Sequence, residues 1–142
     1  MVLVIGKCAG RSATATTWCS RTTGSARAEA IGWPVSRHTS RIRGALLVAP
    51  GDVERPDLRE QVPGWAPIVR QRLPFAATLV GSRNDPFCSH ERAHSLAASW
   101  GAHWVDLGAA GHINADSGLG DWPEGHALLQ SRMNRQGSSA RA

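Results

Sequence analysis

The sequence predicts an α/β fold built on a parallel sheet. Three apolar runs of strand length are bounded by Gly or Pro at their C-terminal ends, and helical or loop segments separate them. Continuous apolar runs of this kind are typical of strands buried on both faces of a parallel sheet. Strands that alternate with helices favour parallel pairing with right-handed crossovers. A chain of 142 residues with 42% hydrophobic content can form one such domain.

The three strands are expected over residues 44–50, 76–81 and 103–107. Between the first two, residues 52–65 are polar and rich in Pro and Gly, which predicts a loop with one helical turn. Residues 108–120 form a Gly-rich loop after the third strand. The order is therefore strand, loop, strand, helix, strand, loop, helix.

Two helices are indicated by capping residues and by apolar spacing. Ser89 can cap the first helix, Glu91 lies in its first turn where the helix dipole favours a carboxylate, and Gly101 can end it. Its apolar positions recur at helical spacing: Ala93, Leu96, Ala97 and Trp100. The second helix is expected to begin at residues 122–124, and the polar tail from Gln136 is expected to fray.

Residues 1–40 show no persistent pattern. Residues 2–5 can form one short strand, but eleven Ser and Thr follow between Ser12 and Ser40. The sequence predicts an aberrant, disordered segment over residues 1–40, and a folded part over residues 41–137.

The positive charge of the chain is confined to its N-terminal part. Residues 1–43 carry seven basic side chains and one acidic one, whereas residues 44–142 carry nine and ten. The folded part is therefore near neutral, and no nucleic-acid partner is expected for it.

Membrane insertion and a disulfide framework are not expected either. No apolar run reaches the roughly 20 residues of a membrane span, and the basic residues follow the first apolar run instead of preceding it, unlike a secretory signal. Three cysteines without a C-x-x-C pair suit reduced thiols. These features predict a cytoplasmic protein.

Asp85 and His112 are the candidate catalytic residues. Each follows the C-terminal end of a predicted strand, where ligands of parallel sheets bind, so we expect both to face one crevice. An Asp that accepts from an imidazole fixes the tautomer of a general base, which is two-thirds of a nucleophilic triad. The alternative is that Asp85 builds the N-D-P turn and His112 is a loop histidine.

Other motifs suggest weaker possibilities. Residues 90–94 match the zinc-binding string H-E-x-x-H, with a third ligand to come from His103, His112 or Glu124, but the string falls in the first turn of a helix. Cys88 can be a thiol nucleophile or a small packing residue. No G-x-S-x-G elbow, P-loop or G-x-G-x-x-G is present, so no metal or cofactor is expected and the nucleophile is unidentified.

Several words from residue 41 onward resemble one family. They are R-I-R-G-A-L-L-V-A-P (41–50), D-V-E-R-P-D-L (52–58), S-R-N-D-P-F-C-S-x-E-R-A (82–93), W-G-A (100–102), V-D-L-G-A-A-G-H-I-N-A (105–115) and S-G-L-G-D-W-P-E-G (117–125). The chain is similar to α/β-hydrolase-fold serine hydrolases related to retinoblastoma-binding protein 9, especially bacterial members. The resemblance implies the C-terminal part of an α/β-hydrolase sheet, with Asp85 and His112 completing a Ser-His-Asp triad.

The departure from this family lies in the first forty residues. Family members carry the serine in an H-S-x-G elbow ahead of the G-A-L-L-V-A-P word, but residues 21–25 read R-T-T-G-S. Suppose that Ser20 and Arg21 are encoded by TCN and CGN codons. Translation of the codons for residues 16–22 two bases out of frame then permits D-L-V-L-A-H, which resembles the strand and His that lead into a family elbow. We therefore expect a frameshifted or truncated gene model, which the nucleotide sequence can test.

The resemblance implies a serine hydrolase for small esters or amides that needs no cofactor. Because no elbow is present, very weak or absent activity is expected. The alternative is a non-catalytic remnant or a binding module that uses the basic N-terminal arm.

Overall fold

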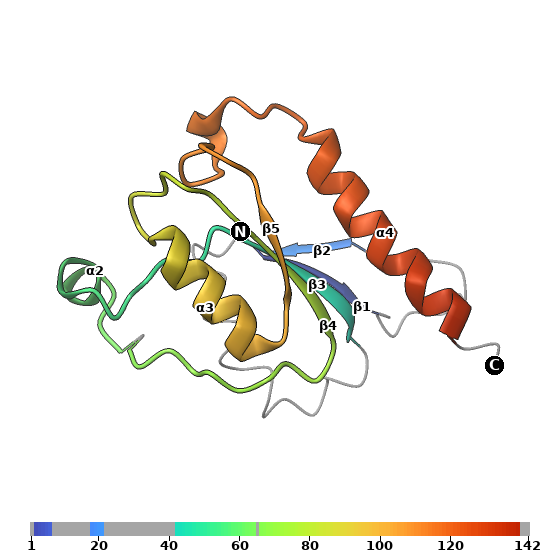
Figure 1. Cartoon of the computed structure of the whole chain (residues 1–142), viewed down its shortest axis with the longest axis horizontal. Coiled ribbons are helices and arrows are strands. Elements are labelled where there is room, and N and C mark those ends of the chain that lie inside the picture. The colour runs from blue at the N-terminus through green and yellow to red at the C-terminus, as the bar shows by residue number, and fades with distance from the viewer. Residues whose placement is uncertain (1, 7–17, 22–41, 65, 140–142) are drawn as a thin grey trace.

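The computed structural model describes residues 2–6, 18–21, 42–64 and 66–139. The elements follow one another along the chain as labelled in Figure 1. They are β1 (Val2–Gly6), β2 (Trp18–Arg21), β3 (Ile42–Val48), α2 (Pro56–Gln61), β4 (Ala76–Gly81), α3 (His90–Trp100), β5 (His103–Asp106), the 3-10 helix η3 (Ala115–Ser117) and α4 (Pro123–Ser139).

The strands form one sheet in the order β2-β1-β3-β4-β5. Strands β3, β4 and β5 are parallel, with Leu47 opposite Leu79 and Val80 opposite Val105, which confirms the predicted parallel sheet. Strand β1 instead pairs antiparallel with both β2 and β3, so the complete sheet is mixed. The apolar run at residues 2–5 predicts a strand but contains nothing that sets its direction.

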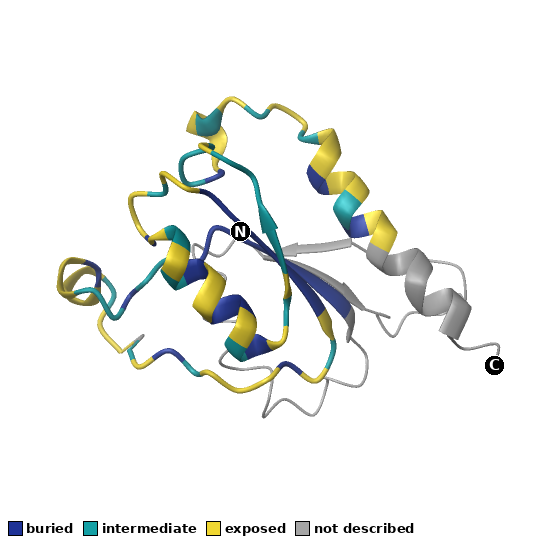
Figure 2. Cartoon of the chain, in the orientation of Figure 1, coloured by how far each residue is buried: buried dark blue, intermediate teal, exposed yellow. Residues whose placement is uncertain are grey.

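Helices α3 and α4 cover opposite faces of the parallel strands (Figure 1). Successive strand side chains point to opposite faces, so Leu47 and Leu79 pack with α3, whereas Leu46 and Val80 pack with α4. Figure 2 shows the buried strands at the centre and a buried stripe along α3. The stripe consists of Ala93, Leu96, Ala97 and Trp100, as the sequence predicts.

Helix α3 begins and ends where its capping residues predict. Ser89 Oγ accepts a hydrogen bond from the Arg92 N–H at 3.2 Å. Gly101 adopts the left-handed conformation at φ +66°, which closes the helix. At the same end the Trp100 indole N–H donates to the Val69 carbonyl at 2.8 Å. These contacts fix the helix that separates β4 from β5.

Some predicted bounds differ from the structure: β3 spans Ile42–Val48 where residues 44–50 were expected, and β5 ends at Asp106 where residue 107 was expected. Helix α4 continues to Ser139, beyond the expected fraying point at Gln136, because a polar sequence can continue a helix that no Pro interrupts. Strand β2 (Trp18–Arg21) was not expected, since no alternating apolar pattern marks it.

The short strand expected at residues 2–5 is present as β1. The expected disorder or frameshift falls mostly on residues 7–17 and 22–40, and the basic arm lies there too. These residues lie outside the described part of the chain, so both ideas stay predictions. Within the described ranges, no helix has both the length and the apolar character needed to cross a membrane.

Candidate active site

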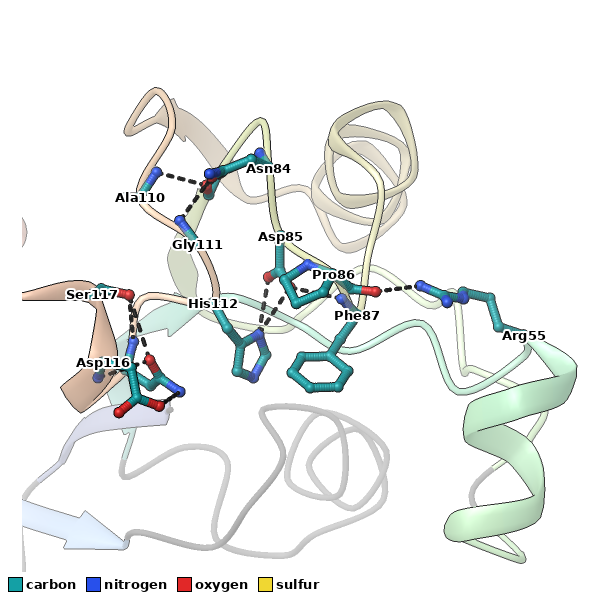
Figure 3. A network of polar contacts seen from close by, with 12 residues as sticks. Arg55, Asn84, Asp85, Pro86, Phe87, Ala110, Gly111, His112, Asp116 and Ser117 are labelled. Atoms are coloured by element: carbon teal, nitrogen blue, oxygen red, sulfur yellow. Dashed lines mark hydrogen bonds and ion pairs between the residues drawn. The ribbon is translucent and has the colours of Figure 1, made fainter.

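Asp85 and His112 meet beyond the C-terminal ends of β4 and β5. His112 Nδ1 lies 3.0 Å from both carboxylate oxygens of Asp85 (Figure 3). The Asp85 side chain is only 3% exposed, whereas the imidazole is 29% exposed. A buried carboxylate therefore holds one edge of the imidazole, and the ring remains partly open to solvent.

The Asp85 carboxylate also builds the turn that follows β4. Its Oδ1 accepts a hydrogen bond from the Phe87 N–H at 2.9 Å, which is the Asx turn expected for an N-D-P sequence. The turn and the imidazole contact are therefore two roles of one side chain. Because the turn orients the carboxylate, the local sequence itself prepares the partner of His112.

Ser82 and Asn84 join the acid loop to the loop that carries His112. Ser82 Oγ accepts from the Ala110 N–H at 2.9 Å, and Asn84 Oδ1 accepts from the Gly111 N–H at 2.7 Å. The Ser82 hydroxyl also lies within hydrogen-bonding distance of Asn84 Oδ1, at 2.8 Å. We call these bonds from Ser82 and Asn84 the clamp. Since Ala110 and Gly111 directly precede His112, the clamp fixes the position of the imidazole relative to the end of the sheet.

We did not predict this clamp from the sequence. Its signal is the S-x-N-D order, which places two short polar side chains between a buried strand and Asp85. Such side chains commonly bond to nearby backbone, but the sequence does not tell which backbone they reach. Here the partners lie about one βαβ unit further along the chain.

His112 is also held by its neighbours on either side. Ile113 has a φ of +50°, a region that β-branched residues rarely adopt, and its side chain is 6% exposed in the core beneath α4. On the other side, the Phe87 ring packs edge-on against the imidazole with ring centroids 4.7 Å apart. Backbone strain of this type persists only where packing maintains it, which here is the burial of Ile113.

A pocket of ≈ 410 Å³ opens beside the imidazole. Its described wall combines the turn after β4 with the loop after β5: Pro86, Ala109, Ala110, Gly111, His112, Asn114, Asp116 and Ser117. The pocket places a space for a small molecule next to the only imidazole in its described wall.

The described serines near this pocket are occupied by structural roles. Ser82 forms the clamp, Ser89 caps α3, and Ser117 exchanges hydrogen bonds with Asn114 in the capping box of η3. None of these three hydroxyls forms a hydrogen bond with His112. Among the described residues, therefore, no serine is placed as a partner of the imidazole.

Cys88 does not supply a nucleophile for His112. Its side chain is 2% exposed within the core beneath α3. Burial, with smaller contributions from Asp52 and Asp85, raises the pKa of the thiol to about 12. A thiol must ionise to act as a nucleophile, so Cys88 is a packing residue.

We accordingly expect Cys88 to resist alkylation in the folded protein. A rise in pKa from 9.0 to about 12 lowers the thiolate fraction at pH 8 by about three orders of magnitude. Iodoacetamide treatment followed by peptide mass spectrometry should modify Cys88 in denaturant but not under native conditions. Native modification at the rate of the denatured thiol would contradict this assignment.

His90 and His94 both pack against Trp104. The ring centroids lie 5.4 and 5.5 Å from that of the indole, and both contacts are edge-on. Gly81 permits this arrangement, because a Cβ there would lie 2.2 Å from the Trp104 ring. Across the described residues, no group of three or more His, Cys, Asp or Glu side chains could hold a metal ion. The H-E-x-x-H string thus starts a helix, and it finds no third ligand there.

Comparisons with known proteins identify the family of the chain. A protein-family model described as serine hydrolase matches residues 24–131. A solved structure from Pectobacterium atrosepticum, described as a YdeN-like hydrolase, is 33% identical and aligns with a TM-score of 0.61 over 73% of this chain and 52% of its own. The chain therefore spans about half the length of that hydrolase, and comparison with the curated proteins found no match. Because the family match covers most of its length, the chain belongs to the serine hydrolase family.

Proposed function

We propose that the chain carries the acid and base of a serine hydrolase site for small esters or amides. The observation that carries the proposal is the contact of His112 Nδ1 with the buried Asp85 carboxylate at 3.0 Å. A carboxylate accepts hydrogen bonds and cannot donate one when ionised, so Nδ1 carries the proton. The lone pair of Nε2 is then available to accept a proton from a nucleophile.

The proposed reaction is acyl transfer. His112 Nε2 takes the proton of a serine hydroxyl as the serine oxygen bonds to the substrate carbonyl carbon. Asp85 stabilises the positive charge that develops on the imidazole, and Nε2 then returns the proton to the leaving alcohol or amine. Water repeats the cycle and releases the acid. The pocket beside His112 supports a small substrate, since its volume is ≈ 410 Å³.

The serine must come from outside the described residues. The family match begins at residue 24, and Ser25, Ser36 and Ser40 fall between that point and β3. None of the three lies in a G-x-S-x-G elbow, which would present the hydroxyl at the top of the sheet. We therefore propose that this chain turns over substrate very slowly or not at all.

Labelling with a fluorophosphonate probe, followed by mapping of the modified residue, tests the proposal. We expect little or no labelling. If a serine is labelled, its reactivity with the probe should depend on His112. Loss of a general base typically lowers the rate by about 10²- to 10⁴-fold, so His112→Ala should abolish the modification. His94→Ala is the matched control, because His94 is an exposed imidazole on α3 that packs against Trp104.

Two results would contradict the proposal. Rapid labelling would refute the expected lack of activity, and labelling that survives His112→Ala would remove His112 from the role of base. Hydrolysis of a p-nitrophenyl ester by the same variants should follow the same order as the labelling.

A further inference from the structure

The loop after β3 bonds directly to the turn that carries Asp85. Arg55 Nη1 donates to the Pro86 carbonyl at 2.6 Å, and the Asp52 N–H donates to the Phe87 carbonyl at 2.9 Å. Figure 3 shows the Arg55 side chain extending from the start of α2 toward the Pro86 carbonyl. The two carbonyls belong to the residues that immediately follow Asp85, so this loop holds the turn from outside.

The guanidinium of Arg55 is itself fixed before it reaches the turn. Its Nε and Nη2 donate to the two carboxylate oxygens of Asp57, at 3.1 and 2.7 Å. This two-point contact matches the planar fork of a guanidinium, and it leaves Nη1 directed at Pro86. Asp57 lies in the first turn of α2, where a carboxylate is favoured.

The other end of the loop is anchored independently of Asp85. Asp52 and Glu54 both bind the Arg92 guanidinium on α3, and Glu54 also accepts from the Ile68 N–H at 2.8 Å. Burial alone would raise the pKa of Glu54, but the Ile68 N–H and the Arg92 guanidinium lower it below its usual value, so the carboxylate is ionised and available for these contacts. The loop is thus attached to α3 and to the segment around Ile68.

We propose that Arg55 is a positioning residue for the Asp85–His112 pair. The contacts form a connected series. Asp57 holds Arg55, Arg55 donates to the Pro86 carbonyl, and the turn joins Pro86 to the Asp85 carboxylate. By fixing the peptide after Asp85, Arg55 limits the rotation that would carry the carboxylate away from Nδ1. This inference rests on the proposed function, since it assigns Arg55 a role in placing that site's acid.

The contacts of this loop give a structural role to a sequence motif that the proposed function does not explain. D-V-E-R-P-D spans residues 52–57 and supplies Asp52, Glu54, Arg55 and Asp57 to these bonds. The Arg55 side chain is 40% exposed and its ion pair with Asp57 is at the surface. Exposed pairs add little to global stability, so a change at the imidazole in an Arg55 variant would reflect the local contact and not a loss of global stability.

Nitrogen NMR of the imidazole in the full-length protein separates the two roles. The share of the Nδ1–H tautomer of His112 reports on its contact with Asp85, and exchange of the Phe87 amide reports on the turn. In Arg55→Ala we expect a smaller Nδ1–H share and about tenfold faster exchange of the Phe87 amide, because a charge-assisted bond is lost. Arg55→Lys should restore part of both signals, since an ammonium can still donate to the Pro86 carbonyl. Arg59→Ala, an exposed arginine on the same helix, should change neither.

The outcomes are distinct. Unchanged tautomer and exchange in Arg55→Ala would overturn the inference, while an Asp85→Asn variant that abolishes the Nδ1–H signal would still support the proposed pair. A parent protein without an Asp85-dependent Nδ1–H signal would overturn both. If Arg55→Ala does not fold, Arg55→Gln decides, because it keeps a polar side chain but removes the guanidinium that joins Asp57 to Pro86. An unchanged His112 signal in Arg55→Gln would then refute the role of Arg55.

Discussion

Replacing Trp100 with alanine is expected to lower the free energy of unfolding by about 3–5 kcal/mol. The indole is 2% exposed and packs between α3 and the sheet. Its N–H donates to the Val69 carbonyl at 2.8 Å, and that carbonyl would lose its partner in the variant. Truncation therefore removes apolar contacts, leaves a cavity and breaks a hydrogen bond at one position.

Urea denaturation followed by far-UV circular dichroism measures this loss. Ser95→Ala is the matched control, because Ser95 is exposed on the same helix and alanine suits a helix. The control should stay within about 0.5 kcal/mol of the parent protein. A Trp100→Ala variant as stable as Ser95→Ala would show that α3 does not pack on the sheet as described.

Replacing Ser82 with alanine is expected to lower the free energy of unfolding by about 1–3 kcal/mol, because the part-buried Ala110 N–H loses its acceptor. The Ser82 side chain is almost completely buried, and its Oγ accepts from the Ala110 N–H at 2.9 Å. The hydroxyl also lies 3.1 Å from the Gly108 carbonyl. A methyl group can replace neither contact. The protein should therefore be less stable, and the loop ahead of His112 should become more mobile.

Two measurements on Ser82→Ala distinguish these effects. Denaturation gives the stability loss, and the imidazole NMR signals of His112 report on the loop. Ser99→Ala is the control. The Ser99 hydroxyl also donates to a backbone carbonyl, that of Ser95 at 3.0 Å, but this bond lies on the surface of α3. A Ser82→Ala variant that matches Ser99→Ala in both measurements would exclude a clamp at this point.

Most of the parallel layer could be predicted from sequence because its signals are local. The apolar run at residues 76–81 coincides with β4, and Ser89 and Gly101 bound α3 as their capping chemistry requires. Strand β2 could not be predicted, because Trp18–Arg21 contains no alternation and owes its pairing to β1. Long-range pairing of this kind depends on context more than on the residues of the strand.

The candidate site was predictable in part for the same reason. Asp85 and His112 follow apolar runs, and the topology of parallel strands brings such positions to one edge. The clamp through Ser82 and Asn84 and the support from Arg55 depend on which distant carbonyl or amide each side chain meets. Spacing along the chain does not encode those partners.

Two short patterns illustrate the opposite failure. H-E-x-x-H has the spacing of zinc ligands, yet His90 and His94 both contact Trp104, a residue that the string does not contain. Cys88 follows the acid turn closely enough to suggest a nucleophile, but its burial keeps the thiol protonated. In both cases the neighbours from other elements decide the chemistry of the side chain.

Asp85 and His112 belong to a single βαβ unit, made of β4, α3 and β5, and this has a consequence for the order of folding. Only α3 and β5 separate the two residues, so pairing β4 with β5 closes a short loop and brings acid and base together. Loops of this size close at a small entropic cost, and such local contacts favour early formation. The acid–base pair should therefore assemble with the parallel strands themselves, before any contact with residues that precede β3.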